Sequence, residues 1–509
     1  MPAATGSSVL SFVRRTPYLA RGFQPLVLFL CFILPAAAAP KTKPAPKADP
    51  NVFRLTLLHT NDIHGHLLPF DYIEAGRGPS EQPLRGGAAR RATLIRRLKK
   101  EIKNPVLVID SGDLFTRGPL TTTYLGQADV AAQNAVGYDL MAVGNNEFKA
   151  RDGFDRNDAA GAQAALQSVV AKSNFPWICA NLTGKDGAPI PGISPYIVKT
   201  IGGVRVGFLG LTTPRSASYP QTKGWTITDP VAAAREWIPK ARAHCDVLIA
   251  VTHLGTPADM LLAAQTSGLD AIVGGDSHTF LYQPLLLSNS HGDPVPVVQD
   301  GEFGVDLGRF DLRFARDGAG KPWHLAAYAD KLLPVDAKLA EDPAVAAALH
   351  PYVASLQTVI GQIGPIAATP AARQHQTTQI VMDALRSDAG ADLALSPDGS
   401  GFFNVFRHPA VTRYDVLAAM PFNDHVVTAN LTGAEVLGLL KAAPTTVASG
   451  QVTGLDPAKT YRVAFVDFSA ASDYHLPAAR LTDTGRDMRD AVITYLETRS
   501  TPQNATRLR

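Results

Sequence analysis

The 509-residue chain is poor in cysteine and in charged residues. Its three cysteines are too few for a disulfide framework, and none belongs to a CxxC pair of the kind that holds zinc. Charged residues make up 18% of the chain, and 48 basic side chains nearly balance 45 acidic ones. This balance argues against a dedicated binder of nucleic acid or of anionic membranes. We therefore expect no nucleic-acid partner.

Apolar residues are plentiful and set the broad class of the protein. They make up 46% of the chain, a share typical of globular proteins. A chain of this length can bury a large core without disulfides or structural metals to stabilise it. Its long apolar runs exclude disorder of the whole chain. Cys179 and Cys245 border apparent core strands, and we expect buried, reduced, inert thiols. A bridge between them in an oxidising compartment stays open as the alternative.

Residues 1–39 have the pattern of an export signal. Basic residues precede an apolar run at 25–35, and small residues at 36–39 offer a cleavage site. The run is too short to span a bilayer comfortably, so we expect no stable membrane insertion after cleavage. An uncleaved anchor is the alternative. Residues 40–50 form a Pro/Lys/Ala linker, and we expect a periplasmic or extracellular mature chain.

From residue 51, apolar strands alternate with helical stretches, which predicts an α/β layered domain. The expected strands are 53–59, 105–110, 138–143, 177–181, 204–211, 247–253 and 271–274. The expected helices include 86–102, 129–136, 159–172 and 231–243. Residues 294–314 alternate like antiparallel strands at a sheet edge.

The composition shifts near residue 335. Residues 335–362 are typical of a helix-rich connector, and 363–500 of a second, α+β domain. In that second domain the expected helices are 377–387, 433–440 and 487–498, and the expected strands are 392–395, 424–430 and 461–465. We expect 501–509 to be a tail.

Five expected strands end in side chains that bind metals. In chain order these residues are Asp62 and His64, then Asp113, Asn145 and His253, and last Asp276 and His278. Ligands bind at the carboxyl edge of open α/β sheets. Asp and His together suit a divalent transition metal. A series of five such strand ends predicts a metal site rather than ordinary polar strand ends.

This series resembles the calcineurin-like dimetal phosphoesterases, and more closely the exported 5′-nucleotidase and UDP-sugar hydrolase family. The motifs that carry the resemblance are LLHTNDIHGHL at 57–67, GGAARRATLI at 86–95, DSGDLFTRG at 110–118, GLTTP at 210–214 and MPFN at 420–423. The resemblance implies a four-layer sandwich domain at 51–334, a connecting helix at 335–362 and a smaller α+β substrate domain at 363–500. It also implies a monomer that hydrolyses a nucleotide or another small phosphate ester.

The resemblance further implies two divalent ions, Zn²⁺, Mn²⁺ or Mg²⁺. Carried over by position, the first metal binds Asp62, His64 and His278, Asp113 bridges both metals, and the second binds Asn145, His253 and Asp276. Two ions about 3.5–4 Å apart clamp a phosphate and lower the pKa of a shared water, which attacks phosphorus without a protein nucleophile.

The chain departs from the family where the phosphate is expected. Asn146 replaces a histidine that stabilises developing charge, and Lys149 replaces the acid that orients this histidine. We consider both as catalytic candidates: Asn146 donates a hydrogen bond but carries no charge, whereas Lys149 offers a positive charge or is a solvated lysine. Asp276 replaces a histidine, which keeps a ligand and favours Mn²⁺ or Mg²⁺.

The expected substrate domain departs too. Residues 396–402 lack the arginine of the family's phosphate-binding segment, and only Arg373 remains upstream. Phe422 matches the first base-stacking aromatic, Phe468 is the candidate for the second, and Asp473 lies beyond it. Core positions for both phenylalanines are the alternative.

Three functions therefore stay open. The first is an exported dimetal phosphoesterase. The second is a related hydrolase with a non-nucleotide ester, as in the sulfur-oxidation thiosulfohydrolases, whose fold is similar. The third is a non-catalytic binding protein that retains the fold, which the changes at Asn146 and Lys149 motivate.

Overall fold

The computed structural model describes residues 49–70, 72, 84–116, 118–149, 158–400, 404–422 and 424–499. The expected export signal at 1–39, most of the linker at 40–50 and the tail at 501–509 lie outside the described residues. Within the described part, no helix has both the length and the apolar character needed to cross a membrane.

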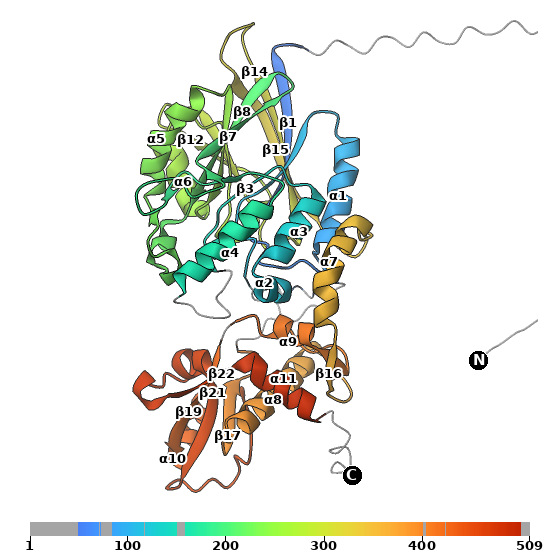
Figure 1. Ribbon diagram of the computed structural model, residues 1–509, viewed down its shortest axis with the longest axis vertical. Coiled ribbons are helices and arrows are strands. Elements are labelled where there is room, and N and C mark those ends of the chain that lie inside the picture. The colour runs from blue at the N-terminus through green and yellow to red at the C-terminus, as the bar shows by residue number, and fades with distance from the viewer. Residues whose placement is uncertain are drawn as a thin grey trace, which may run out of the picture. The chain divides into compact units, whose positions relative to one another are not determined.

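Two mixed β-sheets form the centre of the first half of the chain (Figure 1). The seven-stranded sheet has the order β15-β14-β1-β2-β3-β4-β6, and the six-stranded sheet has the order β12-β13-β11-β10-β8-β7. The strands of the first sheet are β1 (Val52–Thr60), β2 (Val106–Asp110), β3 (Leu140–Ala142), β4 (Trp177–Ile178), β6 (Ile193–Ser194), β14 (Asp306–Ala315) and β15 (His324–Pro334). Those of the second are β7 (Tyr196–Ile201), β8 (Val204–Thr212), β10 (Val247–His253), β11 (Ala271–Val273), β12 (Leu285–Ser288) and β13 (Pro294–Val298).

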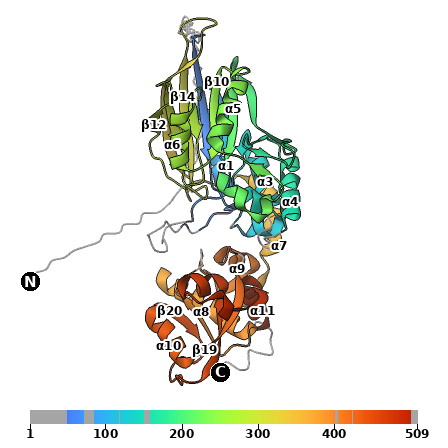
Figure 2. The same ribbon diagram turned by 90° about the vertical axis from the view of Figure 1, so that its left-hand side faces the viewer.

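Helices cover the outer face of each sheet, which gives the four layers that we expected. The helices α1 (Ala88–Glu101), α3 (Gln127–Val136) and α4 (Ala159–Lys172) pack on the seven-stranded sheet, and α5 (Pro230–Arg242) and α6 (Thr256–Gln265) pack on the six-stranded one. The latter two face the viewer in Figure 2. The shorter α2 (Pro119–Tyr124) precedes α3, and a two-stranded ribbon joins β5 (Leu182–Thr183) to β9 (Thr226–Ile227).

The strand β1 shows how the sequence sets these layers. Leu55 and Leu57 belong to the core between the two sheets, whereas Leu58 belongs to the core under the helices. Successive side chains of a strand point to opposite faces, so a continuous apolar run fits a strand covered on both sides. All three leucines are fully buried, and burial of each contributes about 1.5–3 kcal/mol.

The second half of the chain has its own sheet, with the order β20-β17-β21-β19-β22. Its strands are β17 (Leu393–Pro397), β19 (His425–Thr432), β20 (Thr446–Ser449), β21 (Thr460–Val466) and β22 (Thr482–Asp487). Its helices are α8 (Pro370–Asp388), α9 (Arg413–Ala419), α10 (Gly433–Ala442) and α11 (Met488–Arg499), and α8 and α11 share one apolar core on the sheet. A small ribbon pairs β16 (Val359–Gln362) with β18 (Ala410–Thr412).

Two expectations need correction. Residues 294–314 do form antiparallel pairs, β13 with β12 and β14 with β1 and β15, but not at one sheet edge: β13 also pairs in parallel with β11, and β14 lies in the other sheet. Alternation marks a strand but does not say which sheet receives it. The connector at 335–362 is helical only in α7 (Pro343–Leu356), and it ends in β16.

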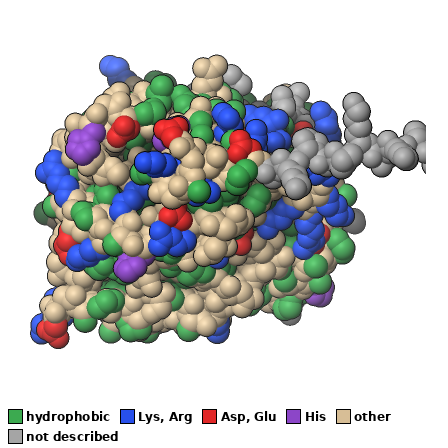
Figure 3. Space-filling model, turned by 90° about the horizontal axis from the view of Figure 1, so that it is seen from above, with side chains coloured by type: hydrophobic (Ala, Val, Ile, Leu, Met, Phe, Trp, Pro, Cys, Tyr) green, Lys and Arg blue, Asp and Glu red, His purple; other side chains and the backbone are tan. Residues whose placement is uncertain are grey.

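Charged side chains of both signs are interspersed on the face seen in Figure 3. This mixture agrees with the nearly equal numbers of basic and acidic residues in the sequence.

Candidate metal centre

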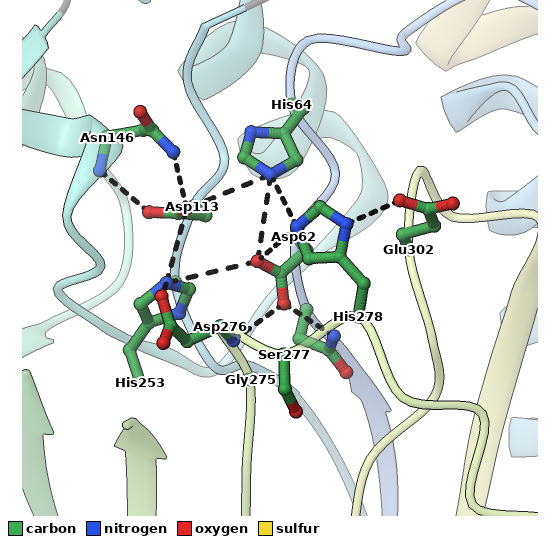
Figure 4. Close-up of polar contacts among 12 residues, drawn as sticks. Asp62, His64, Asp113, Asn146, His253, Gly275, Asp276, Ser277, His278 and Glu302 are labelled. Atoms are coloured by element: carbon green, nitrogen blue, oxygen red, sulfur yellow. Dashed lines mark hydrogen bonds and ion pairs between the residues drawn. The ribbon is translucent and has the colours of Figure 1, made fainter. Parts of the chain in front are cut away.

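The parallel strands of both sheets end at one edge, and the polar residues after them converge there. The strands β1, β2 and β3 run parallel in the first sheet, as do β8, β10 and β11 in the second. The loops after β1, β2, β10 and β11 bring together Asp62, His64, Asp113, His253 and His278 (Figure 4).

Two overlapping clusters of ligand atoms form. The first contains Asp62, His64 and His278, and the second contains Asp62, Asp113 and His253. The Asp62 Oδ1 atom lies 3.6 Å from His64 Nε2 and 3.2 Å from His278 Nε2. The Asp113 Oδ2 atom of the second cluster lies 3.2 Å from His253 Nε2 and 3.7 Å from His64 Nε2 of the first, and Asp62 belongs to both clusters. This placement suits two adjacent cations that share carboxylates.

All three histidines turn Nε2 toward the centre because another group contacts Nδ1. The Nδ1 atom of His64 lies 3.1 Å from the Phe115 carbonyl oxygen. That of His253 lies 2.8 Å from the Ser111 carbonyl oxygen, and that of His278 contacts the Glu302 carboxylate. An imidazole that donates from Nδ1 presents a lone pair at Nε2, which is the arrangement of metal-binding histidines.

The backbone of the site is strained where the ligands are. Five of these residues have left-handed backbone, with φ between 49° and 78°: Asp62, His64, Asp113, Asp276 and His278. Such a conformation costs a residue other than glycine about 1–2 kcal/mol. A fold holds it only where the surrounding structure fixes it, typically at functional sites.

The electrostatics of the site favour positive charge. Burial alone would raise the pKa of Asp113, but His253 and His64 hold it at about 2. Burial alone would lower the pKa of His253, but the carboxylates of Asp113 and Asp62 raise it well above its usual value. The buried carboxylates therefore attract protons or metal ions.

Two buried atoms test whether this site fits a metal. Among the described residues, neither Asp62 Oδ1 nor His253 Nε2 has a hydrogen-bond partner. Buried polar atoms without partners are costly, and a cation would satisfy both. In addition, His64 Nε2 and His278 Nε2 face each other at 3.1 Å, which suits nitrogens that share a cation. The residues present therefore fit divalent ions.

The remaining expected ligands, the buried Asn145 and the partly buried Asp276, share a partner that the sequence did not reveal. Arg215 Nη2 donates to Asn145 Oδ1 at 2.9 Å and to Asp276 Oδ1 at 2.6 Å. Arg215 follows β8, which is a sixth strand ending at this edge. The end of β8 was the one sequence signal that could have indicated Arg215. It was not used because the GLTTP segment contains no residue of a type that binds metals.

The two expected catalytic residues take different places. Asn146 is buried, and its backbone N–H and side-chain Nδ2 donate to Asp113 at 2.7 and 2.5 Å. The neighbouring Glu147, also missed by sequence reasoning, accepts backbone hydrogen bonds from Asp113 and Gly144 and so joins the loops after β2 and β3. Lys149 Nζ lies 4.1 Å from the centre of the Tyr219 ring.

The expected substrate residues lie in the second half of the chain. Because Val426 of β19 pairs with Val466 of β21, Phe422 and Phe468 flank one end of this strand pair. Phe468 is 51% exposed, and Phe422 is half-buried. Asp473 accepts a hydrogen bond from Ser400 at 2.6 Å. This bond joins the loop after β17 to the loop after β21.

Arg373 uses part of its guanidinium locally. Its Nη1 donates to the carbonyl oxygens of Ala367 and Ala368, at 3.3 and 2.9 Å, just before α8. The cysteines behave as expected: Cys179 and Cys245 are buried and free, and burial raises the pKa of the Cys179 thiol to about 12.

Comparisons with known proteins agree with this site. The calcineurin-like phosphoesterase family matches residues 55–280, and the 5′-nucleotidase C-terminal domain family matches residues 358–455. The trifunctional nucleotide phosphoesterase protein YfkN of Bacillus subtilis is 27% identical over 460 residues, covering 82% of this chain and 29% of that protein. Bovine 5′-nucleotidase is 31% identical over 292 residues, covering 54% of this chain and 48% of that protein.

Among solved structures, the 5′-nucleotidase precursor from Thermus thermophilus has a TM-score of 0.62 at 26% identity. The match covers 88% of this chain and 96% of that one. Fold and site therefore define the class, a calcineurin-like metallophosphoesterase with a buried His/Asp metal-site cluster. With the second domain matched as well, the chain belongs to the 5′-nucleotidase family. It spans less than half the length of the two curated relatives above.

Proposed function

We propose that this chain is an exported dimetal phosphoesterase that hydrolyses nucleotides or similar small phosphate esters. The convergence of three imidazole Nε2 atoms on the Asp62 and Asp113 carboxylates carries this proposal. Two bound ions, Zn²⁺, Mn²⁺ or Mg²⁺, would lower the pKa of a shared water and neutralise phosphate charge. Asp62, His64 and His278 would hold one ion, and His253, Asn145 and Asp276 the other, with Asp113 between them.

The protein's own groups orient and restrain this site. The carbonyl oxygens of Phe115 and Ser111 fix the rings of His64 and His253. Asn146 donates to Asp113 and so fixes this carboxylate of the second cluster. These restraints keep the ligands in place while the ester enters, which limits the reorganisation that hydrolysis requires.

Nucleotides are the substrate class that we propose, with Phe468 as the base-stacking side chain. Its exposure of 51% supports this role, because a core residue would be covered. Arg373 already donates from Nη1 to two backbone carbonyl oxygens, so we expect it to bind a 5′-phosphate more weakly than an arginine with all of its donors available. We therefore expect stacking of the base on Phe468 to contribute more to the preference for nucleotides than binding of the 5′-phosphate by Arg373.

A product-release assay tests the proposal: inorganic phosphate is measured for the monoesters, and the nucleoside monophosphate is measured by chromatography for the UDP-sugar and the cyclic nucleotide. The chain without residues 1–39 is supplied with Mn²⁺, Zn²⁺, Mg²⁺ or Co²⁺ and with AMP, a UDP-sugar, a cyclic nucleotide or p-nitrophenyl phosphate. We expect metal-dependent release that Asp113→Ala abolishes and Asp246→Ala retains. Asp246 pairs with Arg205 just before β10 of the six-stranded sheet, at the end of that strand opposite His253, so it controls for the loss of any aspartate.

Each other outcome has a clear meaning. No release above that of Asp113→Ala with any metal would contradict the hydrolase and favour the binding protein. Release from p-nitrophenyl phosphate but equally poor turnover of all nucleotides would contradict the nucleotide substrate and leave the hydrolase in place.

A further inference from the structure

The two residues expected to stabilise the negative charge of the phosphate, Asn146 and Lys149, do not place a positive charge beside the candidate ligands. Asn146 carries no charge, and its amide already donates to Asp113. Lys149 Nζ lies against the Tyr219 ring. A phosphate ester gains negative charge on its oxygens during hydrolysis, so a nearby cation accelerates the reaction.

Arg215 is placed where that charge is needed. Its guanidinium touches Asn145 and Asp276, and Asp276 Oδ1 lies 3.6 Å from His253 Nε2 of the second cluster. The side chain is 57% exposed while that of Asp276 is 12% exposed, so Arg215 lies on the solvent side of the ligands.

Neighbouring groups hold Arg215 in position without using all of its donors. The two bonds to Asn145 and Asp276 both come from Nη2, and Tyr219 is a further hydrogen-bond partner. Lys149 Nζ in turn lies 4.1 Å from the centre of the Tyr219 ring. A guanidinium has five N–H donors in a rigid fork, which leaves donors for a phosphate.

We propose that Arg215 is a catalytic residue, whose guanidinium binds a phosphoryl oxygen of the ester and supplies the positive charge that Asn146 lacks. The inference rests on the proposed function. In the reaction, water forms the new P–O bond, the P–O bond to the leaving oxygen breaks, and the protons of water pass to the leaving oxygen and the phosphate. Arg215 stays protonated throughout.

The same contacts predict a second property. Arg215 neutralises Asp276 in the metal-free protein, so it competes with a divalent ion for the Asn145 and Asp276 oxygens. Removing Arg215 should therefore weaken phosphate binding while Mn²⁺ binding holds or strengthens. A merely structural role would lower both.

The experiment measures binding of Mn²⁺, and then of inorganic phosphate to the Mn²⁺-loaded protein, by calorimetry. For Arg215→Gln we expect phosphate affinity to fall about 10- to 100-fold and Mn²⁺ affinity not to fall. The turnover of p-nitrophenyl phosphate should fall about 100- to 1,000-fold. Arg215→Lys should recover part of the phosphate affinity. The control Arg205→Gln removes a similarly exposed arginine at the other end of β8 and should change neither affinity.

Unchanged phosphate affinity in Arg215→Gln would overturn the inference, as would a wild type that binds Mn²⁺ and hydrolyses esters but binds no phosphate. A wild type that binds no Mn²⁺ would instead overturn the proposed function itself. Loss of Mn²⁺ affinity in Arg215→Gln would assign Arg215 a structural role and also overturn the inference.

Discussion

A single buried carboxylate outside the metal centre shows how burial controls charge in this fold. Asp129, in the first turn of α3, is fully buried and accepts a hydrogen bond from Thr121 Oγ1 at 2.7 Å. Its Oδ2 atom has no hydrogen-bond partner among the described residues. Burial raises the pKa of Asp129 to about 7, so the folded chain retains this proton well above the pH at which an exposed aspartate loses it.

Asp129→Asn should change how stability depends on pH. The unfolded chain releases this proton near pH 4, whereas the folded chain keeps it until about pH 7, so the free energy of unfolding falls as pH rises between these values. Asparagine keeps the acceptor for Thr121 and removes the titration. The free energy of unfolding of Asp129→Asn should exceed that of the wild type only slightly at pH 4. Above pH 7 the difference should reach up to about 4 kcal/mol. Thermal unfolding of the metal-free proteins at both pH values measures this, and an equal change at both would contradict it.

At the scale of elements, the site depends on how closely the loops after β2 and β3 approach each other. Gly112 has a φ of 94°, and a Cβ there would lie 2.6 Å from the Gly144 backbone nitrogen. Glu147 joins the same two loops through backbone hydrogen bonds. The proposed ligands Asp113 and Asn145 each follow one of these glycines, so their spacing depends on the approach.

Gly112→Ala should therefore disrupt the metal centre. The matched control is Gly137→Ala, since Gly137 has a similar φ of 88° but nothing within 4 Å of an added Cβ. Both variants carry the cost of left-handed alanine, about 1–2 kcal/mol. Only Gly112→Ala should also lose bound Mn²⁺, measured as metal content after dialysis. Equal metal content in the two variants would show that the loops do not need this approach.

Several strands could be predicted from the sequence because they are buried on both faces, which gives them long, continuous apolar runs. The strand β10 has the bounds expected from its sequence, and all of its residues are buried. In contrast, α2 and α9 were missed, since helices of six and seven residues carry too little periodicity to detect. The placement of β14 depended on pairing with β1, about 255 residues away, which no local pattern encodes.

Over the whole molecule, the sequence indicates side chains that are recognised by their own type and position at a strand end. It does not indicate side chains whose place depends on contacts with residues far away in the chain. Candidate metal ligands that lie at strand ends, such as Asp62, Asp113 and His253, could be proposed from their order in the sequence. Arg215 could not, because its partners lie 61 and 70 residues away in sequence. Glu302, which contacts His278, comes from a loop with no recognisable pattern.

The stability of the whole chain should depend on bound metal. An ion that binds the folded but not the unfolded chain stabilises it by about 2.7 kcal/mol at 100 times its Kd. Mn²⁺ should therefore raise the Tm of the wild type and chelator should lower it, whereas Asp113→Ala should respond less to both. Calorimetric scans with Mn²⁺ or chelator measure this. A wild-type Tm that is the same in both conditions would contradict it.

The wide separation of the ligands along the chain has a consequence for synthesis. His64 and His278 meet although 214 residues separate them, so a growing chain holds an incomplete first cluster until the later residue has left the ribosome. Products of interrupted translation, or fragments cut between these histidines, therefore lack the complete centre. The candidate metal centre is therefore complete only after residue 278 has been synthesised.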